Sequence, residues 1–95
     1  MKKNLPIACP GCSHALKVKM LHCEKCGTEV NGMFDLPVLC SLASDDQDFI
    51  LEFVKFSGSL KEMAGHMKLS YPTVRNRLDD LIAKIREAEK VYATK

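Results

Sequence analysis

The chain has 95 residues, of which 46% are hydrophobic and 27% are charged, and its formal net charge at pH 7 is +2. This length leaves room for one small core or for two minimal modules. No stretch approaches the roughly 18–20 consecutive apolar residues of a membrane span, and no secretory leader precedes the first cysteine. We therefore expect a cytoplasmic protein, in which paired cysteines are typical of metal ligands rather than of disulfides.

Two Cys-x2-Cys pairs dominate residues 1–34, the first predicted module. The pairs Cys9/Cys12 and Cys23/Cys26 are ten residues apart, with glycines in or directly after them. Each pair can form a tight turn whose backbone N–H groups point at the sulfurs, and two such turns complete a closed tetrahedral site. Because a closed site has no open position for substrate or water, we predict one structural Zn²⁺ bound by these four cysteines, on which folding of the module depends.

Three alternatives concern the same ligands and the remaining cysteine. Iron could occupy four sulfurs as in rubredoxin, but the short gap and the lack of aromatic residues around the pairs argue against a redox centre. His14 or His22 could replace one cysteine, although His22 adjoins Cys23 and would tend to point to the opposite side of a strand. Cys40 lies in an apolar run, which is typical of a small buried residue rather than of a nucleophile.

Short antiparallel strands should accompany the cysteines. Apolar residues alternate with lysines over residues 16–20, which is the period of a half-buried strand. Residues 28–34 predict a second strand, with a turn or a bulge at Asn31-Gly32. Residues 35–43 then form an apolar connector that we expect to pack against the helical part. The predicted fold class is α+β, with a small zinc ribbon followed by a trihelical domain.

The helical domain is predicted over residues 44–95. Ser44 and Gln47 have the spacing of a capping box, and aspartates between and after them suit the positive end of a helix. Gly58 is expected to end this first helix. A second helix should cover residues 60–67.

Residues 60–78 fit the pattern of a helix-turn-helix. Ala64 occupies the small position where the two helices cross, Ser70 is a good N-cap, and Val74 faces inward. Lys68 stands at the turn position that is usually glycine, where a left-handed conformation costs on the order of 1 kcal/mol. The other expected core positions around the turn are Met63, Met67 and Leu69.

The third helix should begin at Tyr71 and serve as the recognition helix. Its apolar residues recur with helical spacing on one stripe, which consists of Val74, Leu78, Leu81, Ile82 and Ile85. No acidic residue of this helix precedes Asp79, so its first turns carry polar and basic groups suited to phosphates and base edges. The predicted DNA-binding residues are Tyr71, Thr73, Arg75, Asn76 and Arg77.

The last helix continues past what a helix-turn-helix needs. Its apolar positions approach the heptad spacing of a coiled-coil seam, through Leu78, Leu81, Ile85, Ala88 and Tyr92. This seam predicts a homodimer through the C-terminal helix. The alternative is that the stripe packs on the first helix or on the ribbon.

Taken together, several blocks resemble a known but uncharacterised family. C-P-G-C, C-E-K-C-G, G-M-F-D-L-P-V-L and S-Y-P-T-V-R-N-R-L are similar to a bacterial and archaeal domain of unknown function, over about residues 7–86. The last block also resembles the final helix-turn-helix of bacterial sigma factors and related response regulators. The resemblance implies a zinc ribbon followed by a helix-turn-helix, and it implies no activity.

The charge pattern leaves the partner open. Residues 1–26 and 59–95 are basic overall, whereas residues 27–58 hold six acids and one lysine. Four zinc-bound thiolates would bring the chain close to neutrality, so nucleic-acid binding by one chain should be weak and strongly salt-dependent.

We predict a zinc-containing, DNA-binding transcriptional regulator. The alternative is a protein-binding adaptor that docks on RNA polymerase, a sigma factor or another regulatory protein, which the acidic middle and the aspartates at 79–80 favour. The sequence contains no Gly-rich phosphate loop, no open metal site and no convincing nucleophile–base pair, so we do not expect an enzyme.

Overall fold

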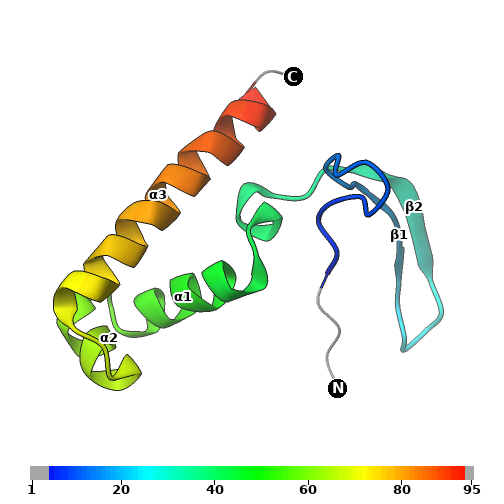
Figure 1. Cartoon of the computed structure of the whole chain (residues 1–95). Coiled ribbons are helices and arrows are strands. Elements are labelled where there is room, and N and C mark those ends of the chain that lie inside the picture. The colour runs from blue at the N-terminus through cyan, green and yellow to red at the C-terminus, as the bar shows by residue number, and fades with distance from the viewer. Residues whose placement is uncertain (1–4, 94–95) are drawn as a thin grey trace.

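A two-stranded hairpin and three helices make up the computed structural model, which describes residues 5–93, with the side chains of residues 91–93 outside that description. Figure 1 shows the hairpin on one side, the helices on the other and a short 3-10 helix, η1, between them. The elements are β1 Val18–His22, β2 Glu29–Phe34, η1 Val38–Ser41, α1 Ser44–Lys55, α2 Leu60–Met67 and α3 Tyr71–Ala93. The predicted α+β class is confirmed.

The hairpin is antiparallel and contains the predicted bulge. Val18 pairs with Phe34 and Met20 pairs with Asn31, so β2 has one residue more than β1 between the two pairs. Gly32 lies in this bulge, and a Cβ there would be 2.7 Å from the Phe34 ring. Glycine is therefore required for the close approach of the ring.

Burial along β1 is less than the alternation predicts. Leu16 and Val18 are half-buried, but Met20 is 50% exposed, because a two-stranded sheet covers little of either face. Leu36, just after β2, is buried at 7% exposure. The hairpin therefore has only a minimal core of its own.

The main core lies between the three helices. Met63 of α2 and Val74 of α3 are fully buried and form its centre. The other buried members are Leu42, Phe49, Leu60, Ala64 and Leu81, with Ile50, Phe53, Phe56, Met67, Leu78 and Ile85 packed around them. All of these residues lie between positions 42 and 85, so the hairpin takes no part in this core.

The predicted capping box at the start of α1 does not form. Ser44 is already helical and Ala43 is the N-cap, so the Ser44 hydroxyl is not at the position that caps a helix. The Gln47 amide instead donates to the Leu42 carbonyl at 2.8 Å and to the Cys40 carbonyl at 3.4 Å. Gln47 thus fastens α1 to η1, in which Cys40 is half-buried.

Most of the apolar stripe of α3 packs against other parts of the same chain. Leu78 and Ile85 pack against the core, and η1 lies against the same helix. Ala88 is half-buried and lines a shallow groove with Leu42. The Tyr92 side chain, which the predicted dimer seam includes, lies outside the described residues. Within residues 5–93, no helix is long and apolar enough to cross a membrane.

Candidate functional site

The turn between α2 and α3 has the geometry of a helix-turn-helix. Lys68 ends α2 in the left-handed region, at φ 58° and ψ 40°, as its position in the pattern predicts. The Leu69 N–H donates to the Ala64 carbonyl at 3.0 Å, which satisfies a carbonyl of the last helical turn. The α2 N-terminus is capped in turn by Ser59, whose hydroxyl accepts from the Glu62 N–H at 3.2 Å.

Ser70 caps α3, as predicted. Its hydroxyl oxygen accepts from the Thr73 N–H at 3.3 Å, and it lies 2.7 Å from the Thr73 hydroxyl. Thr73 therefore contributes to the cap as well as to the surface. This cap fixes where the helix begins and so which residues its first turns present.

One expected core position near the turn is wrong. Leu69 is 43% exposed, whereas Met63 and Ala64 are buried and Met67 is half-buried. The chain reverses direction at the left-handed Lys68, and this leaves Leu69 on the outside of the turn. Leu69 thus borders the surface at the start of α3 instead of filling the core.

Four of the five predicted DNA-binding residues share the open side of α3. Tyr71 is 50% exposed, and Thr73, Arg75 and Asn76 are exposed. The Arg75 Nε lies 3.5 Å from the Asp79 carboxylate, one helical turn away, in a surface ion pair. Such exposed pairs are weak, about 0.3–0.5 kcal/mol, so the guanidinium is readily available to a phosphate.

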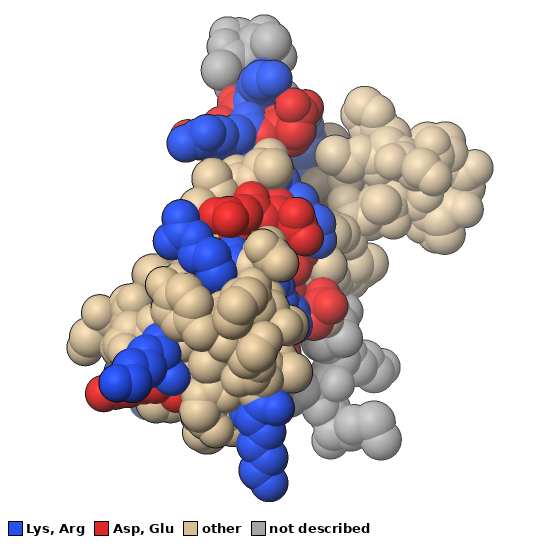
Figure 2. All heavy atoms as spheres, turned by 60° about the vertical axis from the view of Figure 1, so that its left-hand side comes forward, with Lys and Arg blue, Asp and Glu red and all other residues tan. Residues whose placement is uncertain are grey.

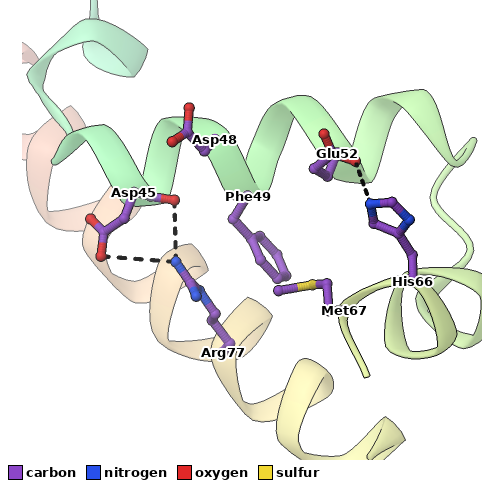
Figure 3. A pocket seen from close by; sticks show the side chains of 7 residues that line it. All are labelled: Asp45, Asp48, Phe49, Glu52, His66, Met67 and Arg77. Carbon is purple, nitrogen blue, oxygen red and sulfur yellow. Dashed lines mark hydrogen bonds and ion pairs between the residues drawn. The ribbon is translucent and has the colours of Figure 1, made fainter. Parts of the chain in front are cut away.

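Arg77, the fifth predicted residue, is directed toward α1. Its Nη2 donates to the Asp45 carbonyl at 3.1 Å and lies 4.0 Å from the Asp45 carboxylate. Its guanidinium carbon is 5.1 Å from the centre of the Phe49 ring. Figure 3 shows this arrangement at the edge of a hollow between α1 and the other two helices, which is lined by Asp45, Asp48, Phe49, Glu52, His66, Met67 and Arg77.

Two exposed lysines of the helix-turn-helix were missed by the motif-based prediction. Lys61 of α2 and Lys68 of the turn are exposed, and neither forms an ion pair with another residue of the described part. In Figure 2 the surface over α2 and the start of α3 is mostly uncharged, with basic side chains and some acidic atoms at its border, whereas acidic and basic groups alternate further along α3. A count of charges over residues 60–78, which hold one acid, Glu62, would have revealed them.

The two cysteine pairs lie in loops of the same geometry. The Cys9 N–H donates to the carbonyl five residues later, at His14, and the Cys23 N–H does the same with Thr28, both at 2.8 Å. A residue with positive φ follows each pair, Ser13 after the first and Gly27 after the second. Each loop is thus a matching two-sulfur half-site.

The surroundings of one thiol in each pair favour the thiolate form that zinc requires. The N–H groups of Gly11 and Cys12 lower the pKa of the Cys9 thiol, and the Gly11 N–H lies 3.3 Å from its sulfur. The Thr28 hydroxyl, 3.0 Å from the Cys26 sulfur, lowers the pKa of that thiol. The donor chemistry therefore fits zinc at each pair.

The structure does not bring the four predicted ligands into one cluster. In Figure 1 the loop with residues 9–13 lies at the end of the hairpin nearest η1, and the β1–β2 turn with the second pair lies at the opposite end. Within residues 5–93, no group of three or more His, Cys, Asp or Glu side chains is placed to hold a metal. The His22 Nδ1 is instead 3.7 Å from the Glu29 carboxylate across the hairpin, and His14 is exposed.

Two family profiles match this chain in adjacent regions. A DUF2089 zinc ribbon matches residues 9–40, and a domain of unknown function (DUF2089)-HTH matches residues 42–88. The border between them falls at the end of η1, where the structure passes from the hairpin side to the helices. Neither a curated protein nor a solved structure matches the chain. With its zinc-ribbon region followed by the helix-turn-helix described above, the chain belongs to the DUF2089 family.

Proposed function

We propose that the protein is a DNA-binding transcriptional regulator that places the start of α3 in the major groove. The observation that carries this proposal is the capped, open first two turns of α3, where Tyr71, Arg75 and Asn76 are exposed and no acid occurs before Asp79. Arginine and asparagine at such positions can form bidentate hydrogen bonds with guanine and adenine. Lys61 and Lys68 would contact phosphates at the border of this surface.

A structural zinc ion is part of the proposal. The two half-sites, Cys9/Cys12 and Cys23/Cys26, supply the four thiols of a closed site, and the family's zinc-ribbon region supports this role. Joining the half-sites around one ion requires the loop at residues 9–13 and the β1–β2 turn to approach each other. The proposal assigns no catalytic reaction to the chain.

Binding to genomic DNA fragments at two salt concentrations tests the proposal. Arg75→Ala and Asn76→Ala should both weaken binding, and Arg75→Ala should also reduce the salt slope by about one if it removes a phosphate contact. Lys90→Ala is the matched control, because it removes a positive charge from the exposed far end of α3. Equal binding by the parent and all three variants would contradict the proposal.

A protein-binding adaptor remains the second candidate. The hollow between α1 and the other helices favours it, because the carboxylates of Asp48 and Glu52 line it together with the apolar side chains of Phe49 and Met67, while Arg77 contacts Asp45 at its edge. A basic protein segment would complement that surface. Recovery from cell extract of one stoichiometric protein partner, unaffected by nuclease, would favour this function over DNA binding.

The proposal also includes a homodimer that forms through the C-terminal helix. Because the stripe up to Ile85 already packs in the chain, pairing of two chains would have to use the helix beyond that residue. Light scattering of the parent and of a chain truncated after Arg86 distinguishes the two cases. A monomeric parent would rule out the proposed homodimer.

A further inference from the structure

Two basic residues of α3 contact two consecutive acids at the start of α1. Arg77 contacts Asp45, and the Lys84 ammonium lies 3.0 Å from the Asp46 carboxylate. Residues seven apart lie on the same side of a helix, two turns from each other. The first turn of α1 thus contacts α3 at two points, which lie two helical turns apart on α3.

The two contacts differ in their surroundings. The Asp46 side chain is only 9% exposed, so its carboxylate depends on Lys84 for its compensating charge. The Arg77 side chain is 37% exposed, and three interactions hold it: the Asp45 carbonyl, the Asp45 carboxylate and the Phe49 ring. A bare electrostatic contact at that exposure would be weak, but the carbonyl and the ring also fix its direction.

The position of Arg77 connects these contacts between α1 and α3 with the proposed DNA-binding surface. Arg77 follows Arg75 and Asn76 directly and lies in the same two turns of α3. A rotation of α3 that freed Arg77 from α1 would also turn its two neighbours relative to the rest of the helical domain. The contact with α1 therefore bears on which way the recognition residues face.

We infer that Arg77 and Lys84 are positioning residues that clamp α3 to Asp45 and Asp46 and thereby set the orientation of the DNA-contacting turns. Arg77, on this account, is not a phosphate contact, although the sequence pattern places it among the DNA-binding residues. The DNA part of this inference rests on the proposed function. The clamp itself rests only on the contacts between α1 and α3.

Replacement of Arg77 by lysine and by methionine separates the two roles. A phosphate contact needs a positive charge, which Arg77→Lys keeps, whereas the clamp needs a planar group that reaches both the Asp45 carbonyl and the Phe49 ring. We expect both variants to bind short duplexes of randomised sequence roughly two- to fivefold more weakly, the equivalent of an exposed cation–π contact. Their salt slopes should equal that of the parent, whereas Arg75→Ala lowers the slope if Arg75 contacts a phosphate.

Amide hydrogen exchange gives a readout that does not depend on DNA. Loss of the clamp should speed exchange in the first two turns of α1 at a temperature where every variant remains folded. Arg86→Met is the control, because it removes an exposed arginine from the same helix. Lys84→Met should also speed exchange in the first two turns of α1, because it leaves the buried Asp46 carboxylate without its compensating charge.

A restored affinity in Arg77→Lys, a salt slope lowered by about one in Arg77→Met, or unchanged exchange in α1 would each overturn the inference. If the parent fails to bind DNA, the proposed function fails, and the exchange measurement still decides whether the clamp exists.

Discussion

At the scale of single residues, Lys68 carries two opposing demands. Its backbone adopts the left-handed conformation that glycine tolerates best, while its side chain adds a positive charge beside the proposed DNA surface. A non-glycine residue in this conformation is uncommon and costs stability. Under the proposed function, the Lys68 side chain contacts a phosphate, and within the described residues it forms no ion pair.

Lys68→Gly should therefore stabilise the fold and weaken DNA binding at the same time. Relief of the left-handed backbone should raise the free energy of unfolding by up to about 1 kcal/mol. Loss of the charge should lower the salt slope of DNA binding by about one. Denaturant titration and binding at two salt concentrations measure the two effects. A salt slope equal to that of the parent would show that Lys68 has no phosphate role.

Gly65 shows the opposite case, a glycine that the backbone does not need. It lies in α2 with helical φ, it is exposed, and nothing lies within 4 Å of the position that a Cβ would take. Gly65→Ala should stabilise the protein by about 0.5–1 kcal/mol, because alanine loses less backbone entropy on entering a helix. Thermal unfolding checks this value. A destabilised variant would mean that another surface approaches α2 there.

At the scale of elements, local signals predicted the helices well. Lys68 and Ser70 are short-range features, and they bound α2 and α3 in the structure as the sequence indicates. The predicted capping box at the start of α1 is wrong because the Gln47 side chain donates to carbonyls in η1 and directly after it, outside the helix. The contact between Arg77 and Asp45 joins residues 32 positions apart, so no helical pattern could reveal it.

The two serines that resemble N-caps provide a matched test. Ser70→Ala should cost about 0.5–2 kcal/mol of stability, because the Thr73 N–H loses its acceptor. Ser44→Ala should cost almost nothing, since Ser44 makes no capping hydrogen bond. Chemical denaturation of both variants measures the difference. Equal losses would place the α1 cap at Ser44 after all.

At the scale of the whole molecule, the hairpin and the helices are separate bodies joined through η1. The radius of gyration is 16.5 Å, against about 12 Å for a compact chain of this length. The main core lies wholly within residues 42–85. The placement of the two cysteine pairs relative to each other is a long-range property, and their spacing in the sequence, from which four zinc ligands are predicted, does not determine it.

Removal of zinc should therefore change the hairpin region and leave the helical domain unaffected. Under the proposal of one structural ion, a chelator should release about one zinc per chain and increase amide exchange in residues 9–34. The helices should keep their circular dichroism and their melting temperature, because the hairpin adds nothing to their core. Cooperative loss of helix on chelation would show that the two bodies fold together.

Contact between the start of α3 and DNA is tested most directly by titration of the ¹⁵N-labelled, zinc-loaded protein with duplex DNA. We expect the largest amide shift changes at Lys61, Lys68, Tyr71 and residues 73–76, and these changes should diminish in Arg75→Ala. The clamp at Arg77 should keep the amides of α1 nearly unchanged. Shift changes confined to the hairpin, or to the part of α1 that carries Asp45, Asp48 and Glu52, would contradict DNA contact by α3. The absence of any shift change would contradict it as well.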